Sequence, residues 1–253
     1  MDLGLDGARV LVTGGTRGIG RAICEAFLAE GAAVAFCARR EDEVGETQQT
    51  LTKTGGRAVG RVLDVADHAA LAQWVGEMAE ELGGIDVFIP NVSAGASAQG
   101  VEAWRANFEV DVLHSVLGCE AALSHLAASE QGAIVLVNTI AAVESLFAPH
   151  SYGALKAALI SWGKQMAVAL GPHGVRVNMV SPGPVHFPGG DWDRVRGQDP
   201  ALYRSVEQRI PMGRFIRPEE VARAVVYLAS PAAAMVTGTN LVIDGGMTRR
   251  VQF

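Results

Sequence analysis

The chain has 253 residues but only three cysteines, and aromatic residues make up 6% of it. Cys24, Cys37 and Cys119 are far apart and form no CxxC pair, so neither a disulfide framework nor a metal site is expected. The sequence also lacks an apolar run long enough to cross a bilayer, and its first residues lack the basic and apolar regions of a signal peptide. We therefore expect a cytoplasmic protein with no membrane partner.

Positive charge is not in excess either. The formal net charge is −6 and the isoelectric point is about 5.5. A mildly acidic surface repels phosphate backbones, so nucleic acid is not expected as a partner. Hydrophobic residues make up 49% of the chain, which is enough to build a sizeable core.

Strand-like and helix-like segments alternate from end to end, with no linker or repeat between them. The strands are continuous apolar runs, as in a parallel sheet that is buried on both faces. The sequence thus predicts one α/β domain over residues 1–253, a Rossmann-like doubly wound sheet of about seven strands with helices on both faces. Expected strands are Ala8–Thr13, Ala33–Ala38, Ala58–Leu63, Val87–Pro90, Ala133–Thr139, Val175–Val180 and Asn240–Ile243. Expected helices are Ile19–Glu30, Glu41–Thr52, Ala69–Leu82, Ala103–Ala127, Tyr152–Leu170 and Pro218–Leu228. An irregular, Gly- and Pro-rich insertion at about Val185–Arg209 suggests a substrate lid.

A glycine-rich turn joins the first strand to the first helix. Its glycines allow a sharp turn and let a pyrophosphate approach the helix N-terminus, where free N–H groups favour anions. A strand before the turn and a helix directly after it distinguish this turn from an ordinary tight loop, which is the alternative interpretation. The expected nucleotide-binding residues are Gly14, Thr16, Arg17, Gly18, Ile19 and Gly20.

The second strand ends in Ala38-Arg39-Arg40, where an NAD site would carry an acidic residue for the ribose 2′-hydroxyl. Arg39 and Arg40, together with Arg17, could instead surround a 2′-phosphate. We therefore favour NADP(H) over NAD(H), although two arginines at a strand end can also be ordinary solvated charges. Asp64, followed by Val65, could hydrogen-bond the adenine or could simply cap a helix.

Tyr152 and Lys156 are four residues apart in a helical segment and so share one face. A phenol has a pKa near ~10 and is a poor acid or base at neutral pH unless a neighbouring charge perturbs it. An ammonium group favours the phenolate, so this pair could exchange a proton with a substrate oxygen. Taken alone, the Tyr-x-x-x-Lys spacing is also common by chance.

These motifs occur in order with Ser181-Pro182-Gly183-Pro184-Val185 and the late Asp244-Gly245-Gly246. The chain resembles the short-chain dehydrogenase/reductase family over nearly its whole length, including 3-oxoacyl carrier-protein reductases. The resemblance implies that Tyr152 is the general acid/base and that Lys156 binds the nicotinamide ribose. It also implies that Pro182, Gly183 and Val185 line the nicotinamide, and it puts Thr139 at the position of the substrate-orienting serine. The family also forms oligomers, and two long helices rich in apolar residues fit a homotetramer.

Three departures from the family pattern bear on catalysis. Only Asn91 remains of a two-asparagine run, in Pro90-Asn91-Val92-Ser93. Thr139 replaces serine. Asp111 aligns with an asparagine that usually completes a proton relay, and its carboxylate could hold the same water while opposing the effect of Lys156 on Tyr152.

The sequence therefore predicts an NADP(H)-dependent oxidoreductase that interconverts a ketone or aldehyde and an alcohol. Two alternatives stay open: an NAD-dependent alcohol dehydrogenase on the same fold, and a nucleotide-binding scaffold or sensor with weak turnover. The small-molecule substrate itself is not specified by the sequence. The residues expected to border its pocket are Val92, Ala94, Ala141, Phe147, His150, His186, Phe187 and Trp192.

Overall fold

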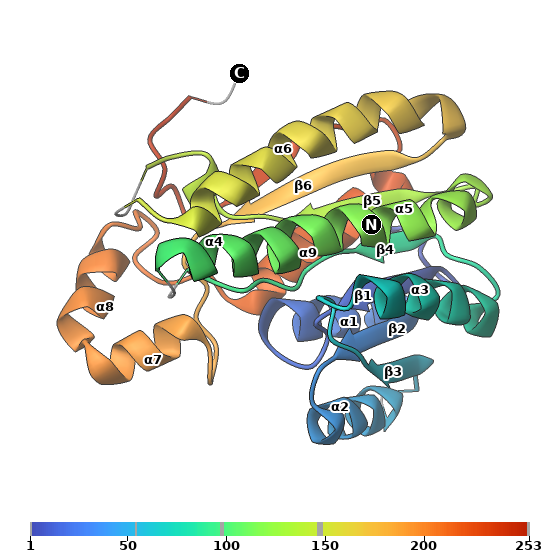
Figure 1. Ribbon diagram of the computed structural model, residues 1–253, viewed down its shortest axis with the longest axis horizontal. Helices are drawn as coiled ribbons and strands as arrows, with labels where there is room; N and C mark the ends of the chain where they lie inside the picture. The colour runs from blue at the N-terminus through green and yellow to red at the C-terminus, as the bar shows by residue number, and fades with distance from the viewer. Residues whose placement is uncertain (1, 54, 97–98, 146–148, 252–253) are drawn as a thin grey trace.

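The computed structural model describes residues 2–53, 55–96, 99–145 and 149–251. Its centre is one parallel sheet of seven strands in the order β3-β2-β1-β4-β5-β6-β7, which confirms the predicted doubly wound architecture (Figure 1). The strands are β1 (Arg9–Thr13), β2 (Ala33–Ala38), β3 (Ala58–Val62), β4 (Val87–Ile89), β5 (Ala133–Val137), β6 (Arg176–Pro182) and β7 (Asn240–Ile243).

Strand β1 lies at the point where the strand order reverses. It pairs with β2 on one side, Val10 opposite Val34, and with β4 on the other, Val10 opposite Val87. The connections that leave β1 and β4 therefore diverge to opposite sides. In an open parallel sheet, a ligand binds at the carboxyl ends of the strands beside such a reversal.

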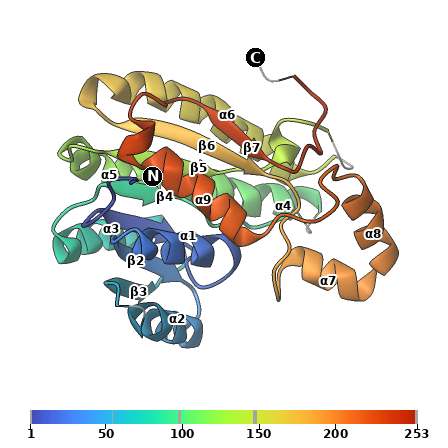
Figure 2. The same ribbon diagram turned by 180° about the vertical axis from the view of Figure 1, so that it is seen from behind.

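Helices cover both faces of the sheet (Figures 1 and 2). Helices α1 and α9 pack together over one face, and α3, α5 and α6 cover the other; each layer encloses its own apolar core. Within the described residues, no helix has the length and apolar character required to cross a membrane. The helices are α1 (Gly18–Ala29), α2 (Glu41–Lys53), α3 (His68–Leu82), α4 (Gly100–Asn107), α5 (His114–Ala127), α6 (Ser151–Leu170), α7 (Asp191–Gln198), α8 (Pro200–Gln208) and α9 (Pro218–Ala229), with short 3₁₀ turns at Ile140–Ala142 (η2), Gly171–His173 (η3) and Pro231–Ala233 (η4).

The long helix expected over Ala103–Ala127 is not one regular helix. A π-helical segment, η1 (Phe108–Leu113), separates α4 from α5. Such a segment widens the helix by one residue per turn and leaves carbonyl groups to be satisfied in other ways. Here the His114 ring bonds the Val110 carbonyl at 2.8 Å, and the Ser115 hydroxyl donates to the Asp111 carbonyl at 2.8 Å. Side-chain hydrogen bonds therefore stabilise the interruption, which hydrophobic periodicity does not reveal.

The segment expected to be irregular, Val185–Arg209, contains the two short helices α7 and α8, which project beside the sheet (Figure 1). Their mutual packing is aromatic. The Tyr203 and Phe215 rings stack with centroids 4.2 Å apart, and Trp192 lies 5.2 Å from Phe215. Aromatic burial gives this polar segment a small core of its own, so it folds instead of remaining a loop.

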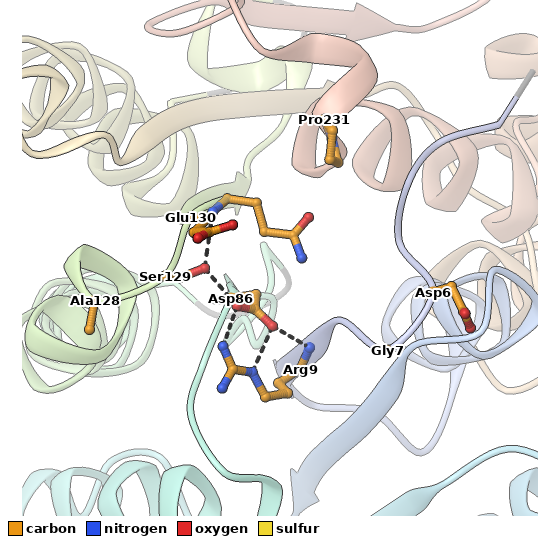
Figure 3. A pocket seen from close by; sticks show the side chains of 9 residues that line it. Asp6, Gly7, Arg9, Asp86, Ala128, Ser129, Glu130 and Pro231 are labelled. Carbon is orange, nitrogen blue, oxygen red and sulfur yellow. Dashed lines mark hydrogen bonds and ion pairs between the residues drawn. The ribbon is translucent and has the colours of Figure 1, made fainter.

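A polar pocket lies at the amino ends of the strands (Figure 3). The charged side chains Arg9 and Asp86 in its lining form an ion pair with each other. The Arg9 guanidinium donates to Asp86 at 2.6 and 2.8 Å, and the Ser129 hydroxyl donates to the same carboxylate at 2.6 Å. Burial raises the pKa of Asp86, but the hydrogen bonds from Arg9 and Ser129 outweigh burial and hold the pKa below its usual value. This network joins β1, β4 and the loop before β5, a structural role.

Candidate active site

The predicted site residues gather at the carboxyl edge of the sheet, because each follows the end of a strand or begins the next helix. Gly14 follows β1, Arg39 follows β2 and Asn91 follows β4, while Thr139 comes after β5 and Pro182 ends β6. Segments far apart in the chain therefore form one surface across the reversal between β1 and β4.

The glycine-rich turn has the backbone geometry that the sequence predicts. Gly14 and Gly18 have positive φ angles of 73° and 54°. A Cβ atom on Gly20 would lie 2.1 Å from the Gly14 carbonyl oxygen, so no larger residue fits there. Arg17 occupies the N-cap of α1 without a side-chain hydrogen bond, and the following residues Gly18 and Ile19 form its first turn. The N-terminus of α1 is thus free of an internal cap, as an anion site requires.

A hydrogen-bonded chain that sequence reasoning missed holds this turn in place. The Asn91 amide donates to the carbonyl oxygens of Thr13 and Gly14 at 2.9 and 3.3 Å, and the Asn91 N–H donates to the Thr13 hydroxyl at 2.9 Å. That hydroxyl lies 2.9 Å from Nε2 of His114, which is fully buried. Asn91 therefore shapes the loop.

The state of His114 follows from its partners. Burial lowers the pKa of His114 to about 4, so the ring is neutral at pH 7. Because the Val110 carbonyl can only accept, Nδ1 carries the proton and Nε2 accepts from Thr13. No sequence pattern indicates this link between α5 and the nucleotide loop.

The arginines at the end of β2 differ in availability. Arg40 is paired with Asp42 at 2.8 Å and with Glu43 at 3.3 Å. Arg39 and Arg17 are exposed, and neither side chain has a hydrogen-bond or ion-pair partner within the described residues. Arg39 and Arg17 are therefore better suited than Arg40 to meet a phosphate group. The Thr16 hydroxyl, in the glycine-rich turn, donates a hydrogen bond to Glu43 of α2 at 3.3 Å.

The remaining predicted nucleotide residues lie on the same edge. The Asp64 carboxylate is exposed and accepts from the Ala66 N–H at 3.1 Å, whereas the N-cap of α3 is Asp67. Val65 is buried in the core beneath the edge. Gly183 follows β6, where an added Cβ would lie 3.0 Å from the Asp244 backbone, and Val185 bridges to Ile216.

Tyr152 and Lys156 lie one turn apart in α6, near its N-terminus. His150 caps this helix, because its Nδ1 accepts from the Gly153 N–H at 3.0 Å. A Cβ on Gly153 would lie 2.7 Å from the Ala141 carbonyl oxygen, so glycine lets the helix approach the segment after β5 closely. This approach brings Tyr152 beside Thr139, at the end of that strand.

Lys156 is buried, with 2% of its surface exposed, and has two partners. Its ammonium group donates to the Val137 carbonyl at 2.9 Å and lies 3.3 Å from Oδ1 of Asp111, which is fully buried. The two groups are close enough for a direct ion pair, and a relay water held by Asp111 stays a prediction.

Two further residues hold Asp111. Its Oδ2 accepts from the Asn107 amide at 2.8 Å and from the Ala94 N–H at 3.2 Å. Asn107 in turn accepts from the Ser151 hydroxyl at 2.6 Å and donates to the Gly95 carbonyl at 2.9 Å. Sequence reasoning missed Asn107, although its spacing of four from Asp111 was a usable signal.

The surroundings of Tyr152 raise its pKa. Burial has the largest effect and the negative charge of Asp111 adds to it, while hydrogen bonds with the Thr139 and Ser93 hydroxyls act in the opposite direction. The phenol is therefore protonated at neutral pH. Ser93 is a second hydroxyl beside the phenol that the prediction omitted.

The α7–α8 segment borders both the nucleotide loop and the loop after β4 that contacts Tyr152. The Phe187 ring lies against Gly18, since a Cβ there would come within 2.6 Å of it, and Asp191 at the start of α7 lies beside Gly95. His186 and Trp192 belong to the aromatic core of the segment. Phe147, also expected at the pocket, lies outside the described residues.

The glycine-rich loop, the buried Lys156 and the Tyr152 phenol together are typical of the active site of a dinucleotide-dependent oxidoreductase. Comparison with known proteins agrees with this class. A family model described as enoyl-(acyl carrier protein) reductase matches residues 14–248. The chain belongs to the short-chain dehydrogenase/reductase family, as the sequence predicts.

Three relatives are informative. Isoepoxydon dehydrogenase of Penicillium expansum is 40% identical over 99% of this chain and 98% of its own length. D-threitol dehydrogenase of Mycolicibacterium smegmatis is 34% identical over 98% and 95%. L-sorbose reductase of Gluconobacter frateurii, solved with NADPH and L-sorbose, superposes with a TM-score of 0.90 at 28% identity over 99% and 100% of the two chains.

Proposed function

We propose that the protein is an NADP(H)-dependent carbonyl reductase that interconverts a ketone or aldehyde and an alcohol. The observation that carries this proposal is the position of the Tyr152 phenol, which contacts Thr139 and lies one turn from the buried Lys156 on the nucleotide-loop edge. A phenol that keeps its proton at neutral pH is in the form that donates to a carbonyl oxygen.

The residues present fit a dinucleotide. The uncapped first turn of α1 and the close glycines of its loop would receive the pyrophosphate, and Arg39 with Arg17 would meet the 2′-phosphate. Pro182, Gly183 and Val185, at and just after the end of β6, would line the nicotinamide, as the family resemblance implies. The bound cofactor supplies a hydride, which the carbonyl carbon accepts.

Proton transfer falls to the chain's own side chains. Thr139 would hold the substrate oxygen with its hydroxyl, and Tyr152 would give its proton to that oxygen. Lys156 would bind the ribose hydroxyls and stabilise the resulting phenolate. Asp111 acts through Lys156, because its carboxylate keeps the ammonium group in place beside the Val137 carbonyl. Asp111 is thus a positioning residue.

The α7–α8 segment serves as a substrate lid in this proposal. It contacts the nucleotide loop through Phe187 and the Tyr152 side through Asp191, so it can exclude water from both halves of the site. We also propose a homo-oligomer, a tetramer, because Val101, Trp104 and Phe108 expose apolar surface along α4 and η1.

Cofactor titration combined with turnover tests the proposal. The protein should bind NADPH more tightly than NADH, as followed by nicotinamide fluorescence, and should oxidise NADPH with members of a panel of small ketones. Ala38→Asp should move the preference toward NADH, because a carboxylate accepts from a 2′-hydroxyl and repels a 2′-phosphate. Preference for NADH in the parent would favour the NAD-dependent alternative. Tight NADPH binding without turnover of any ketone would favour the scaffold or sensor.

A further inference from the structure

The lid carries a carboxylate toward the reacting phenol. Asp191 is the first residue of α7, and its Oδ2 lies 3.7 Å from the position of a Cβ atom on Gly95. Gly95 belongs to the loop after β4, whose residue Ser93 contacts Tyr152. The same closeness explains why the negative charge of Asp191 raises the pKa of Tyr152.

Asp191 is held in this position from two sides. Its Oδ1 forms an ion pair with Arg194, one turn further along α7. The adjacent Trp192 is fixed against Phe215, with ring centroids 5.2 Å apart. Oδ1 is the carboxylate oxygen nearest to Arg194, while Oδ2 lies toward Gly95. One oxygen is therefore anchored, and the other is available to accept a hydrogen bond from a ligand.

Two other polar groups lie around Tyr152. The Ser93 hydroxyl accepts from the Gly95 N–H at 2.9 Å and bonds the Tyr152 phenol, which leaves it one lone pair that can accept from a ligand. His150 uses Nδ1 to cap α6, so in its neutral form Nε2 carries a proton, and its ring centroid lies 6.1 Å from that of Tyr152. A carboxylate, a hydroxyl and an imidazole N–H together match the hydrogen-bonding needs of substrate hydroxyl groups.

The charges of this region do not suit an anionic substrate. Lys156 is paired with Asp111, and Arg194 is paired with Asp191 itself. A substrate carboxylate would meet Oδ2 of Asp191 with no unpaired cation among these groups to offset the repulsion. The expected ligand is therefore neutral.

We infer that Asp191 and Ser93 form a subsite for a second hydroxyl group, and that the substrate is a neutral hydroxylated ketone or the corresponding polyol. This inference rests on the proposed function and adds the substrate class to it. Asp191 would repel a carboxylate at the position where it accepts from a hydroxyl, so the subsite disfavours acidic substrates.

Matched ketone pairs test the subsite. Acetoin is compared with 2-butanone, and 4-hydroxycyclohexanone with cyclohexanone, each by kcat/KM with NADPH. The parent should prefer the hydroxylated member of at least one pair by about tenfold, equivalent to roughly 1.4 kcal/mol. Asp191→Asn should lower that ratio severalfold, because a neutral amide oxygen is a weaker acceptor than a carboxylate. The same substitution should improve 4-oxocyclohexanecarboxylate relative to its methyl ester.

Asp193→Asn is the matched control, because Asp193 lies on the same helix and bonds the Gly189 N–H and Arg196 instead. It should leave both ratios unchanged. Equal changes in Asp191→Asn and Asp193→Asn would mean that lid packing sets the preference, which overturns the subsite. Equal kcat/KM for hydroxylated and plain ketones in the parent would also overturn it, while leaving the reductase proposal intact. Failure to reduce any ketone would overturn the proposed function and the subsite together.

Discussion

Replacing Asp111 by asparagine probes the buried ion pair without changing the shape of the side chain. Asp111 accepts at both oxygens: Lys156 approaches Oδ1, while Asn107 and the Ala94 N–H donate to Oδ2. An asparagine has only one acceptor oxygen. Its NH₂ group must therefore face either the ammonium group or the two N–H donors, so either Lys156 or both Asn107 and Ala94 lose an acceptor.

The loss of unfolding free energy expected for Asp111→Asn follows from the distance between the Asp111 carboxylate and the Lys156 ammonium group. At 3.3 Å, two unit charges attract by about 5 kcal/mol at an effective dielectric constant of about 20. Desolvation of both groups offsets much of this attraction, but removing one partner leaves the other charge buried and uncompensated, at about 3–5 kcal/mol. The amide oxygen of Asp111→Asn can still accept one hydrogen bond. We therefore expect a loss near the lower end, about 3 kcal/mol of unfolding free energy.

Urea denaturation of four proteins measures this coupling: the parent, Asp111→Asn, Lys156→Met and the double variant. The double variant should be more stable than the sum of the single losses predicts, by about 2 kcal/mol, because neither charge is then left alone. Additive losses would refute a direct ion pair. Because Asp111 raises the pKa of Tyr152, the alkaline decline of ketone reduction should also move to lower pH in Asp111→Asn. An unchanged pH profile would contradict the placement of this charge beside the phenol.

Three other perturbations test the surrounding structure. Joint replacement of Arg39 and Arg40 by alanine should weaken NADPH binding and leave NADH binding nearly unchanged in a fluorescence titration; equal losses would remove the phosphate role. Burial lowers the pKa of His114 from 6.5 to about 4, so the unfolded chain binds more protons in this window and stability falls as the pH drops through it, by roughly 3 kcal/mol. His114→Gln should show a flatter acid limb in chemical denaturation, and an unaltered limb would contradict the neutral buried ring. Gly20→Ala should abolish nucleotide binding because its Cβ would meet backbone, whereas Gly45→Ala, with open space around it in α2, should bind normally; normal binding by both would argue against the close fit of the loop.

Much of the fold follows from local pattern. Continuous apolar strands with intervening amphipathic helices leave few alternatives to a parallel sheet, and all seven strands occur where the sequence predicts them. The order of motifs also brings Gly14, Tyr152 and Lys156 to one edge, because the carboxyl ends of parallel strands coincide. These features depend on short-range pattern and on topology.

Features that depend on tertiary hydrogen bonds were not predictable in the same way. The π segment at Phe108–Leu113 shares the apolar periodicity of its neighbours, and its stability comes from His114 and Ser115 side chains bonding freed carbonyls. Helices α7 and α8 form around an aromatic cluster whose members Trp192 and Phe215 are 23 positions apart in the sequence. The direct contact between Asp111 and Lys156 likewise joins two helices that are distant in the sequence, η1 and α6.

The central claim is that the Tyr152 phenol supplies the proton for carbonyl reduction in an NADPH-dependent enzyme. The most direct test is single-turnover transfer of deuterium from 4-deuterated NADPH to a ketone of the panel by the parent and by Tyr152→Phe, with NADPH affinity measured for both. The account predicts labelled alcohol from the parent, near-equal NADPH affinity, and a loss of more than about tenfold in the transfer rate for Tyr152→Phe. A variant that binds NADPH and keeps the parental transfer rate would contradict it.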